Sequence, residues 1–232
     1  MVFVVAEIGV NWDGDRDLLK KMISVSKESG CNAVKFQAFT EQMVQNHPQK
    51  SRLMKSSISE NNVEIINDIA NSIGIEWFCT PMYPEAVIFL NPFVKRFKIR
   101  EFDGRGILKN EKSELFESIY RTKKEIIISS QSISNNSDYF SDPRIKWLYC
   151  VPKYPCELEE LNFNLLNNFD GYSNHSPKLI APVAASVLGS KIIEVHITSD
   201  KSQNFIDNNV SFDFDELKNL LNLIRQVEKI NL

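Results

Sequence analysis

The chain has 232 residues, of which 43% are hydrophobic and 25% are charged, and its formal net charge is -3. This composition is typical of a globular protein that can bury a core, and it excludes an intrinsically disordered chain. The slight negative charge argues against a general nucleic-acid-binding surface, although a local group of lysines can still hold a small anion such as a phosphorylated molecule.

The N-terminal run MVFVVAEIGV is apolar but short, with no basic residue ahead of it and a charge already at Glu7. Such a run is too short for a signal peptide or a membrane span. The cysteines show no CxxC spacing, so buried free thiols are favoured over a disulfide or a metal cluster; they are Cys31, Cys79, Cys150 and Cys156. These features predict a cytoplasmic protein that has no membrane contact.

Short runs rich in Val, Ile, Phe and Trp alternate with helical segments along the whole chain. The runs cover residues 3–9, 33–39, 75–81, 96–102, 125–130, 145–151, 169–175 and 192–198. Most are continuous rather than alternating, as expected for parallel strands that are covered on both faces. Eight units in 232 residues average roughly 29 residues each, close to the repeat of a barrel of about 250 residues. We therefore predict an α/β fold, a single-domain (β/α)8 TIM barrel over residues 1–232.

The clearest helices are predicted at 17–29, 62–72, 177–188 and 213–229, and the ends of the first three are marked by Gly30, Gly74 and Gly189. The weakest helix prediction is 133–142. The polar segment 41–59 is longer than an ordinary connection, so it is either a lid over the barrel mouth or a disordered insertion. A Rossmann-type open sheet is the rival fold, but GVNWDGD follows the first strand in place of a glycine-rich phosphate-binding turn.

Polar side chains gather where the predicted strands end, which in a parallel barrel is where active sites lie. The candidates are Glu7, Lys35, Gln37, Thr80, Lys98, Asp103, Ser129, Tyr154, Ser173, His175 and His196. Taken one at a time, these residues also have explanations that need no active site. A lysine can lie at the surface, a hydroxyl can hydrogen-bond within the protein, and a histidine can be part of the core. Lysines within buried strands are harder to explain in this way, because an inward ammonium group requires an anion nearby.

The lysines and hydroxyls in this set are suited to an anionic substrate. Lys35 and Lys98 are cationic donors, and Thr80, Ser129 and Ser173 are small hydroxyls, so that all five can hydrogen-bond the oxygens of phosphate or carboxylate groups. Together they indicate a cradle for both kinds of group.

The histidines in this set are suited to a metal ion. His175 and His196, with carboxylates nearby, suit a divalent metal that keeps open positions for substrate and water. The mixture of nitrogen and oxygen ligands favours Mn²⁺, or another divalent ion such as Mg²⁺, over structural zinc. Such a metal can polarise an aldehyde oxygen, and Glu7 is the candidate acid or base.

Several short motifs, in order along the chain, resemble the signature of the sialic acid synthase family. They are AEIGVNWDGD, CNAVKFQAF, FCTP, FKI, CVPKYP, GYSNHS, IIEVHIT and IDNNVSFDFDEL, and the resemblance runs from Val4 to Val227. Enzymes of this family are (β/α)8 barrels that condense phosphoenolpyruvate with an open-chain N-acetylated amino sugar, typically N-acetylmannosamine, to give a nonulosonic acid and phosphate. The resemblance implies the same metal-assisted transferase reaction here.

By position, the resemblance also implies roles for the candidate residues. His175 and His196 would bind Mn²⁺. Phosphoenolpyruvate would be held by Lys35, Thr80, Lys98, Ser129 and Ser173, and the reaction centre and acceptor side would be lined by Glu7, Gln37, Asp103 and Tyr154. The family's C-terminal antifreeze-like domain is not part of these 232 residues, so we expect a separately encoded cap protein, a homo-oligomer or a different acceptor.

Departures from the family pattern leave two alternatives open. Trp12 and Pro152 stand where the family usually has His and Asn, and Arg100 and Glu101 replace a pair of small residues. A carboxylate at Glu101 repels a phosphate unless Arg100, Arg105 or a metal neutralises it. The alternatives to a synthase are a metal-dependent barrel enzyme with a different anionic substrate and a non-catalytic binding barrel in glycan biosynthesis.

Overall fold

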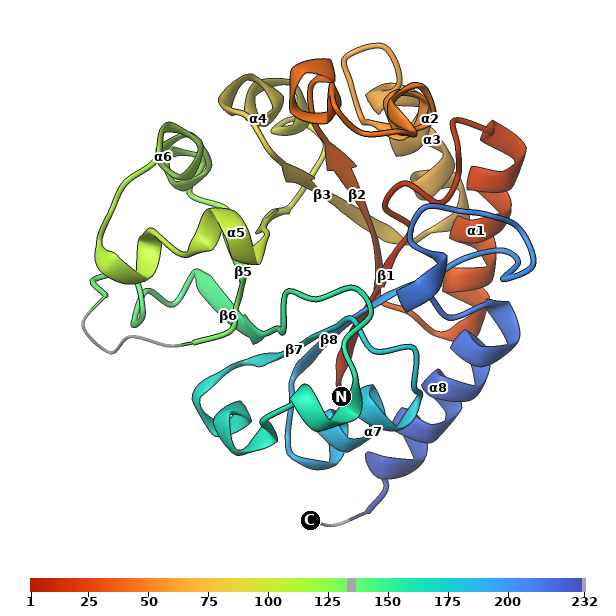
Figure 1. Cartoon of the computed structure of the whole chain (residues 1–232), viewed down its shortest axis with the longest axis vertical. Coiled ribbons are helices and arrows are strands. Elements are labelled where there is room, and N and C mark those ends of the chain that lie inside the picture. Colours follow the sequence, from red (N-terminus) through yellow and green to blue (C-terminus); the bar gives the residue numbers. More distant parts are fainter. Residues whose placement is uncertain (133–136, 231–232) are drawn as a thin grey trace.

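The computed structural model describes residues 1–132 and 137–230. Within them, parallel strands close into an eight-stranded barrel in chain order, with β8 pairing with β1, and Figure 1 shows these strands as a ring inside the helices. The strands are β1 (Phe3–Glu7), β2 (Ala33–Ala38), β3 (Glu76–Pro81), β4 (Arg96–Ile99), β5 (Glu125–Ser130), β6 (Ile145–Tyr149), β7 (Gly171–Asn174) and β8 (Ile192–His196). The predicted (β/α)8 barrel is confirmed, and the open-sheet alternative is wrong.

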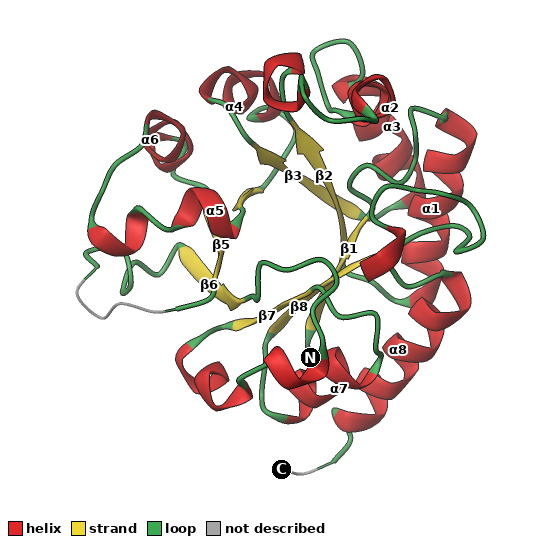
Figure 2. Cartoon of the chain, viewed as in Figure 1, coloured by secondary structure: helices red, strands yellow, loops and turns green. Residues whose placement is uncertain are grey.

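Helices cover the outside of the barrel (Figure 2). The α-helices are α1 (Arg16–Ser29), α2 (Lys50–Ser56), α3 (Val63–Ile73), α4 (Pro84–Leu90), α5 (Glu101–Gly104), α6 (Glu114–Arg121), α7 (Ile180–Val187) and α8 (Phe214–Val227). Short 3-10 helices are η1 (Glu41–Val44), η2 (Ile107–Lys109), η3 (Leu158–Glu160), η4 (Phe163–Asn168) and η5 (Asn208–Val210). The four helices that were predicted most clearly are all present.

The helix ends follow local chemistry. The Asp15 carboxylate accepts hydrogen bonds from the backbone N–H groups of Asp17 and Leu18, which start α1. At its other end Gly30 has φ 98°, a left-handed conformation that favours glycine and stops the helix. These signals are local, which is why the ends of α1 could be read from the sequence.

Gly171 fixes the pairing of β7 with β8. A Cβ atom at this position would lie 1.9 Å from the backbone carbonyl oxygen of Ile192, so only glycine allows the two strands to approach this closely. The resulting register places Gly171 opposite Ile192 and Ser173 opposite Glu194. The close approach therefore brings two polar side chains of neighbouring strands to the same end of the barrel.

The predicted strand 96–102 is too long. β4 ends at Ile99, and Glu101 begins α5, because the N–H of Gly104 donates to the carbonyl oxygen of Arg100 at 3.0 Å and closes a helical turn. The Arg105 guanidinium also pairs with the Glu101 carboxylate one turn earlier. This turn places charged side chains around the rim of the barrel.

The segment 41–59 is ordered, so disorder is the wrong alternative. Arg52 of α2 forms an ion pair with Asp13 in the loop after β1 and donates to the carbonyl oxygen of Asn204 in the loop after β8. Leu53 packs with Val10 and is only 7% exposed. These contacts attach α2 to loops on the mouth side of the barrel, as a lid requires.

Three smaller predictions can also be compared with the structure. The predicted helix 133–142 lies partly outside the described residues, and residues 137–142 form turns instead. All four cysteines are buried and free, as predicted. Among the described residues, no helix is both long enough and apolar enough to cross a membrane.

Candidate active site

A cavity of about 400 Å³ opens at the carboxyl ends of the strands. The residues predicted for the site come together here, with one exception, and line the cavity: Glu7, Lys35, Gln37, Thr80, Lys98, Ser129, Tyr154, Ser173, His175 and His196. The cavity is large enough for small-molecule substrates, which proteins bind in spaces of about 300–1,000 Å³. The exception is Asp103.

Lys98 lies on the cavity floor and is paired with Glu194 of β8. Its Nζ is 3.1 Å from both carboxylate oxygens of Glu194 and donates to the Ser129 hydroxyl at 2.7 Å. Ser173 donates to the same carboxylate at 3.0 Å. Burial lowers the pKa of Lys98, and the nearby Glu194 carboxylate offsets only part of that effect.

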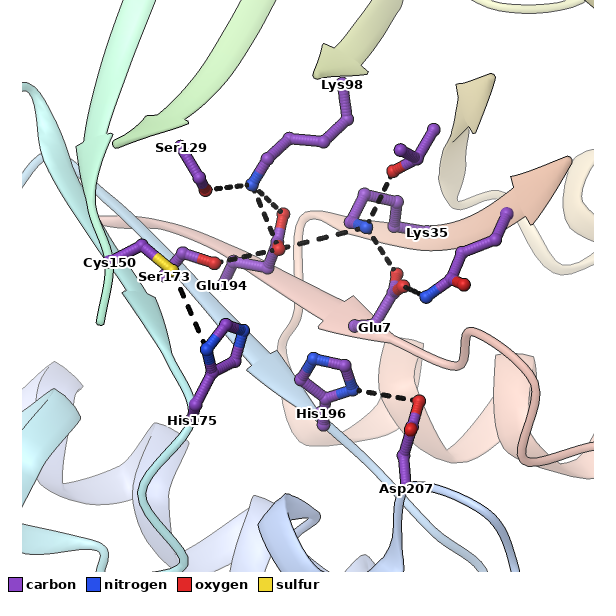
Figure 3. Close-up of polar contacts among 12 residues, drawn as sticks. Glu7, Lys35, Lys98, Ser129, Cys150, Ser173, His175, Glu194, His196 and Asp207 are labelled. Carbon is purple, nitrogen blue, oxygen red and sulfur yellow. Dashed lines mark hydrogen bonds and ion pairs between the residues drawn. The ribbon is translucent and has the colours of Figure 1, made fainter. Parts of the chain in front are cut away.

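Lys35 lies beside Lys98 and completes a buried charge cluster (Figure 3). Its Nζ is 2.9 Å from Glu7 Oε2, 3.0 Å from the Thr80 hydroxyl and 3.8 Å from Glu194 Oε1. Burial lowers the pKa of Lys35, but the Glu194 and Glu7 carboxylates outweigh burial, so the net shift is upward. Gln37 donates to the other oxygen of Glu7 at 2.8 Å and fixes that carboxylate.

At the cavity floor, the positive charges of two lysines therefore balance the negative charges of two glutamates. Burial alone would raise the pKa of Glu194, but the Lys35 and Lys98 ammonium groups hold it well below its ordinary value. Glu194 thus makes the ion pairs that an anionic substrate would otherwise make with these lysines. Such an arrangement can bind an anion if the substrate competes with Glu194 for them.

His175 and His196 lie next to each other on the wall, with ring centroids 5.5 Å apart. Nδ1 of His175 is 2.8 Å from the Val151 carbonyl oxygen, and Nδ1 of His196 is 3.5 Å from Asp207 Oδ2. The second contact is long for a hydrogen bond and acts mainly through charge. Because both Nδ1 atoms face acceptors, we infer that they carry the ring protons, which leaves each Nε2 turned toward the space between the rings (Figure 3).

The pKa values of the two histidines are shifted in opposite directions. Burial, with the neighbouring His196, lowers the pKa of His175 to about 3, so this ring is neutral at pH 7. Burial also lowers the pKa of His196, but the contact with Asp207 outweighs it and the net shift is upward. Burial raises the pKa of the Cys150 thiol, which lies 3.6 Å from His175, to about 12.

The fit of these side chains to a metal ion can be judged from the donor atoms. Within the described parts of the chain, no three His, Cys, Asp or Glu side chains converge closely enough to hold an ion by themselves. Two imidazoles, each backed by a carbonyl or carboxylate acceptor, do fit a divalent ion that takes its other ligands from water and substrate. The metal remains a prediction, and His175 and His196 are suitably placed for it.

Tyr154 stands at the entrance to this part of the cavity. Its hydroxyl is 2.7 Å from Nε2 of His175, and the two rings lie 4.0 Å apart. The phenol thus shares the space into which the two Nε2 atoms point. A ligand bound beside the histidines would meet this hydroxyl.

The charge of Glu101 is neutralised by its own neighbour. Glu101 lines the cavity and accepts hydrogen bonds from Arg105 at 2.9 and 2.7 Å, a bidentate pair. A phosphate could bind near Glu101 only if a positive charge neutralised this carboxylate, and Arg105 supplies that charge. Of the other departures, Arg100 and Pro152 line the cavity, whereas Trp12 is buried in the hydrophobic core.

The position of Asp103 does not support its predicted role. Asp103 lies on α5, its carboxylate pairs with Arg100, and it is not among the residues that line the cavity. The strand was predicted to continue to residue 102, whereas β4 ends at Ile99 and Asp103 lies in the helical turn that follows, where its carboxylate faces Arg100.

Several residues of the site were not predicted. Glu194 had a detectable signal, because it lies two residues before His196 and so on the same side of β8. Asp207 faces His196 from the loop before η5; it lies within the motif IDNNVSFDFDEL, but its contact with His196 could not be placed from the sequence. Nor could an apolar set that lines the cavity, namely Val10, Leu53, Met82 and Ile206.

Comparison with known proteins gives a consistent result. Residues 22–231 match the model of the NeuB family. The chain is 31% identical to N,N'-diacetyllegionaminic acid synthase of Legionella pneumophila, over 98% of this chain and 72% of that protein. It is 30% identical to N-acetylneuraminate-9-phosphate synthase of Homo sapiens, over 98% of this chain and 70% of that protein. The crystal structure of N-acetylneuraminic acid synthetase from Leptospira borgpetersenii has the same fold, with a TM-score of 0.85 at 24% identity over 98% of this chain and 84% of that chain.

Proposed function

The chain belongs to the NeuB family, and on that basis we propose that it condenses phosphoenolpyruvate with an N-acetylated amino-sugar aldehyde to give a nonulosonic acid and phosphate. The acceptor we propose resembles N-acetylmannosamine, the metal is Mn²⁺ or Mg²⁺, and the reaction takes place in the cytoplasm. The observation that carries the proposal is the pair of buried lysines at the barrel mouth, because two ammonium groups among hydroxyls suit a ligand that bears both phosphate and carboxylate.

Phosphoenolpyruvate would bind across the cavity floor. Lys35 and Lys98, with the hydroxyls of Thr80, Ser129 and Ser173, would donate to its phosphate and carboxylate oxygens. In doing so the anion would take over contacts that the lysines make with Glu194, so binding exchanges one buried ion pair for another instead of creating a new one. The lysines are thus held in place before the substrate arrives, which favours positioning over rearrangement.

Glu7 is the group placed to move a proton. Gln37 and Lys35 each hold one of its carboxylate oxygens, so its orientation is fixed at the end of β1. As the enol carbon bonds to the aldehyde carbon, the aldehyde oxygen needs a proton that an acid at this position can supply. Water then adds to the former enol carbon, loses its proton to a base, and phosphate leaves by cleavage of the C–O bond. Glu7, a carboxylate in its pair with Lys35, can take the proton that the water loses and pass it to the former aldehyde oxygen.

The acceptor side would be organised by the histidines and Tyr154. A divalent ion held by Nε2 of His175 and His196 would supply Lewis-acid polarisation of the aldehyde oxygen. Asp207 and the Val151 carbonyl oxygen keep the two rings oriented. The Tyr154 hydroxyl, which contacts Nε2 of His175, would hydrogen-bond the sugar.

Calorimetric titration of the Mn²⁺-loaded protein with phosphoenolpyruvate tests the proposal. We expect saturable binding that Lys98→Ala abolishes and that Lys95→Ala, an exposed lysine three residues earlier, leaves unchanged. Binding of the metal without binding of phosphoenolpyruvate would favour the alternative with another anionic substrate. Binding of neither would favour a non-catalytic barrel.

A further inference from the structure

Asp207 lies in a loop and not in a strand, yet its carboxylate faces the ring of His196 (Figure 3). Its Oδ2 is 3.5 Å from Nδ1 of His196. A contact of this length is at the outer limit of a hydrogen bond, so a small movement of the loop would break it. Asp207 can therefore orient the ring only if something holds the loop in place.

Two buried side chains hold the backbone of Asp207 from both sides. Its N–H group donates to Oδ1 of Asn11 at 3.0 Å, and its carbonyl oxygen accepts a hydrogen bond from the Ser211 hydroxyl at 2.7 Å. Asn11 and Ser211 are both 0% exposed. Because a buried backbone group that loses its partner costs free energy, these bonds fix the peptide groups on either side of Asp207.

Asn11 also attaches this loop to the end of β8. Its Nδ2 donates to the carbonyl oxygen of Ile197, the residue after His196, at 2.9 Å, and to the Ser211 hydroxyl at 3.0 Å. Its amide group thus uses its oxygen and both of its N–H bonds to join the segments that carry the carboxylate and the imidazole.

These contacts differ from those of an asparagine that only stabilises its own turn. Asn174, beside His175, bonds the backbone of Ser176 two residues later, which is a local turn contact. The side-chain partners of Asn11 are instead 186 to 200 residues away in the sequence. Asn11 therefore acts between distant loops at the barrel mouth.

We propose that Asn11, with Ser211, is a positioning residue for the metal site. The two side chains hold the Asp207 carboxylate beside Nδ1 of His196, which keeps the ring proton on Nδ1 and leaves Nε2 free for a divalent ion. The inference rests on the proposed function, in which His196 is a metal ligand. Neither Asn11 nor Ser211 lines the cavity, so their effect on the ion passes through Asp207.

Calorimetric titration of the intact protein with Mn²⁺ tests this. Groups that orient a metal-binding histidine change metal affinity by about 10–100-fold, so we expect the Kd for Mn²⁺ to rise about tenfold or more in Asn11→Ala and in Ser211→Ala. Ser211→Ala is the milder change and serves if Asn11→Ala does not fold. Ser26→Ala is the matched control, because Ser26 is also 0% exposed and donates to a backbone carbonyl oxygen, but on α1. It should leave the Kd unchanged, and wild-type affinity in Ser211→Ala would overturn the inference.

A double-mutant cycle separates positioning from a general structural role. Asp207→Ala should weaken Mn²⁺ binding at least as much as Ser211→Ala does. Because Ser211 acts through Asp207, adding Ser211→Ala to Asp207→Ala should raise the Kd no further. Additive losses of affinity would mean that Ser211 acts by another route, and would overturn the inference.

The tautomer of His196 gives a readout that needs no metal. Long-range ¹H–¹⁵N NMR spectra of protein labelled with ¹⁵N-histidine, recorded without added metal at alkaline pH, show which ring nitrogen carries the proton. We expect Nδ1–H for His196 in the wild-type protein and a shift toward Nε2–H in Ser211→Ala, with the exposed His47 unchanged in both. The same tautomer in both proteins would overturn the inference.

The inference and the proposed function can fail separately. Wild-type protein that binds no Mn²⁺ would contradict the metal of the proposed function, and the tautomer of His196 would still decide the inference. Mn²⁺ binding that is weakened through Asp207, in a protein that forms no nonulosonic acid, would support the inference and contradict the proposed function.

Discussion

Replacing Glu194 by glutamine perturbs the lysine cluster most sharply, because both cavity lysines converge on this carboxylate. The change preserves the shape of the side chain and removes its charge. At an effective dielectric constant of about 20, the 3.1 Å contact with Lys98 corresponds to roughly 5 kcal/mol of attraction. Breaking such a buried pair costs about 3–5 kcal/mol, since the partner charge stays buried. We therefore expect the free energy of unfolding to fall by about that amount.

The same variant tests whether the lysines form an anion site. Phosphate or phosphoenolpyruvate bound at Lys35 and Lys98 would replace the missing charge, so added anion should stabilise Glu194→Gln more than it stabilises the wild-type protein. Urea and thermal unfolding at increasing phosphoenolpyruvate concentration measure both effects. As a matched control, Glu125→Gln removes a carboxylate that pairs with Arg96 at the far end of the barrel, and should cost about 1 kcal/mol or less with no anion dependence. Unchanged stability of Glu194→Gln, or equal stabilisation of both proteins by phosphoenolpyruvate, would refute the reasoning.

Three further changes test other parts of the structure. His196→Ala should abolish binding of the divalent metal with little change in Tm, as metal analysis and thermal unfolding will show; a variant that unfolds yet retains metal would mean that the ligand is misassigned. Gly171→Ala should strongly destabilise the barrel in urea unfolding, because its Cβ would lie 1.9 Å from the Ile192 carbonyl oxygen, and wild-type stability would contradict the strand register. The Arg144 guanidinium lowers the pKa of Asp142 from 3.8 to about 2, so this pair stabilises the fold above about pH 4 and loses that contribution as pH falls toward 2; Asp142→Asn should remove this part of the pH dependence of the free energy of unfolding, and an unchanged pH dependence would argue against the pair.

The barrel could be predicted because its signals are local. Buried parallel strands leave continuous apolar runs, and glycines such as Gly30 mark where helices stop. Most of the site followed from the fold, since polar residues at the carboxyl ends of strands must share one mouth. For example, Lys35 on β2 and His196 on β8 are far apart in the sequence, but both could be assigned to the barrel mouth because each lies near the end of its strand.

What could not be predicted depends on contacts between distant segments. Glu194 is visible in the sequence as a carboxylate in an apolar run, but its pairing with lysines of β2 and β4 depends on distances across the barrel. The end of β4 was misplaced because nothing in the run RFKIREF marks the helical turn that begins at Glu101. Leu53 lies in a polar segment and lines the cavity only because Arg52 attaches α2 to the neighbouring loops.

The most direct test of the proposed condensation is to follow the bridging oxygen of phosphoenolpyruvate. Phosphoenolpyruvate labelled with ¹⁸O between carbon and phosphorus would be incubated with the protein, Mn²⁺ and either N-acetylmannosamine or N-acetyl-6-deoxymannosamine, and the products analysed by mass spectrometry. We expect a nonulosonic acid together with phosphate that carries the label, and neither product from Lys98→Ala. Pyruvate that retains the label, or unreacted phosphoenolpyruvate with both sugars, would contradict the proposal.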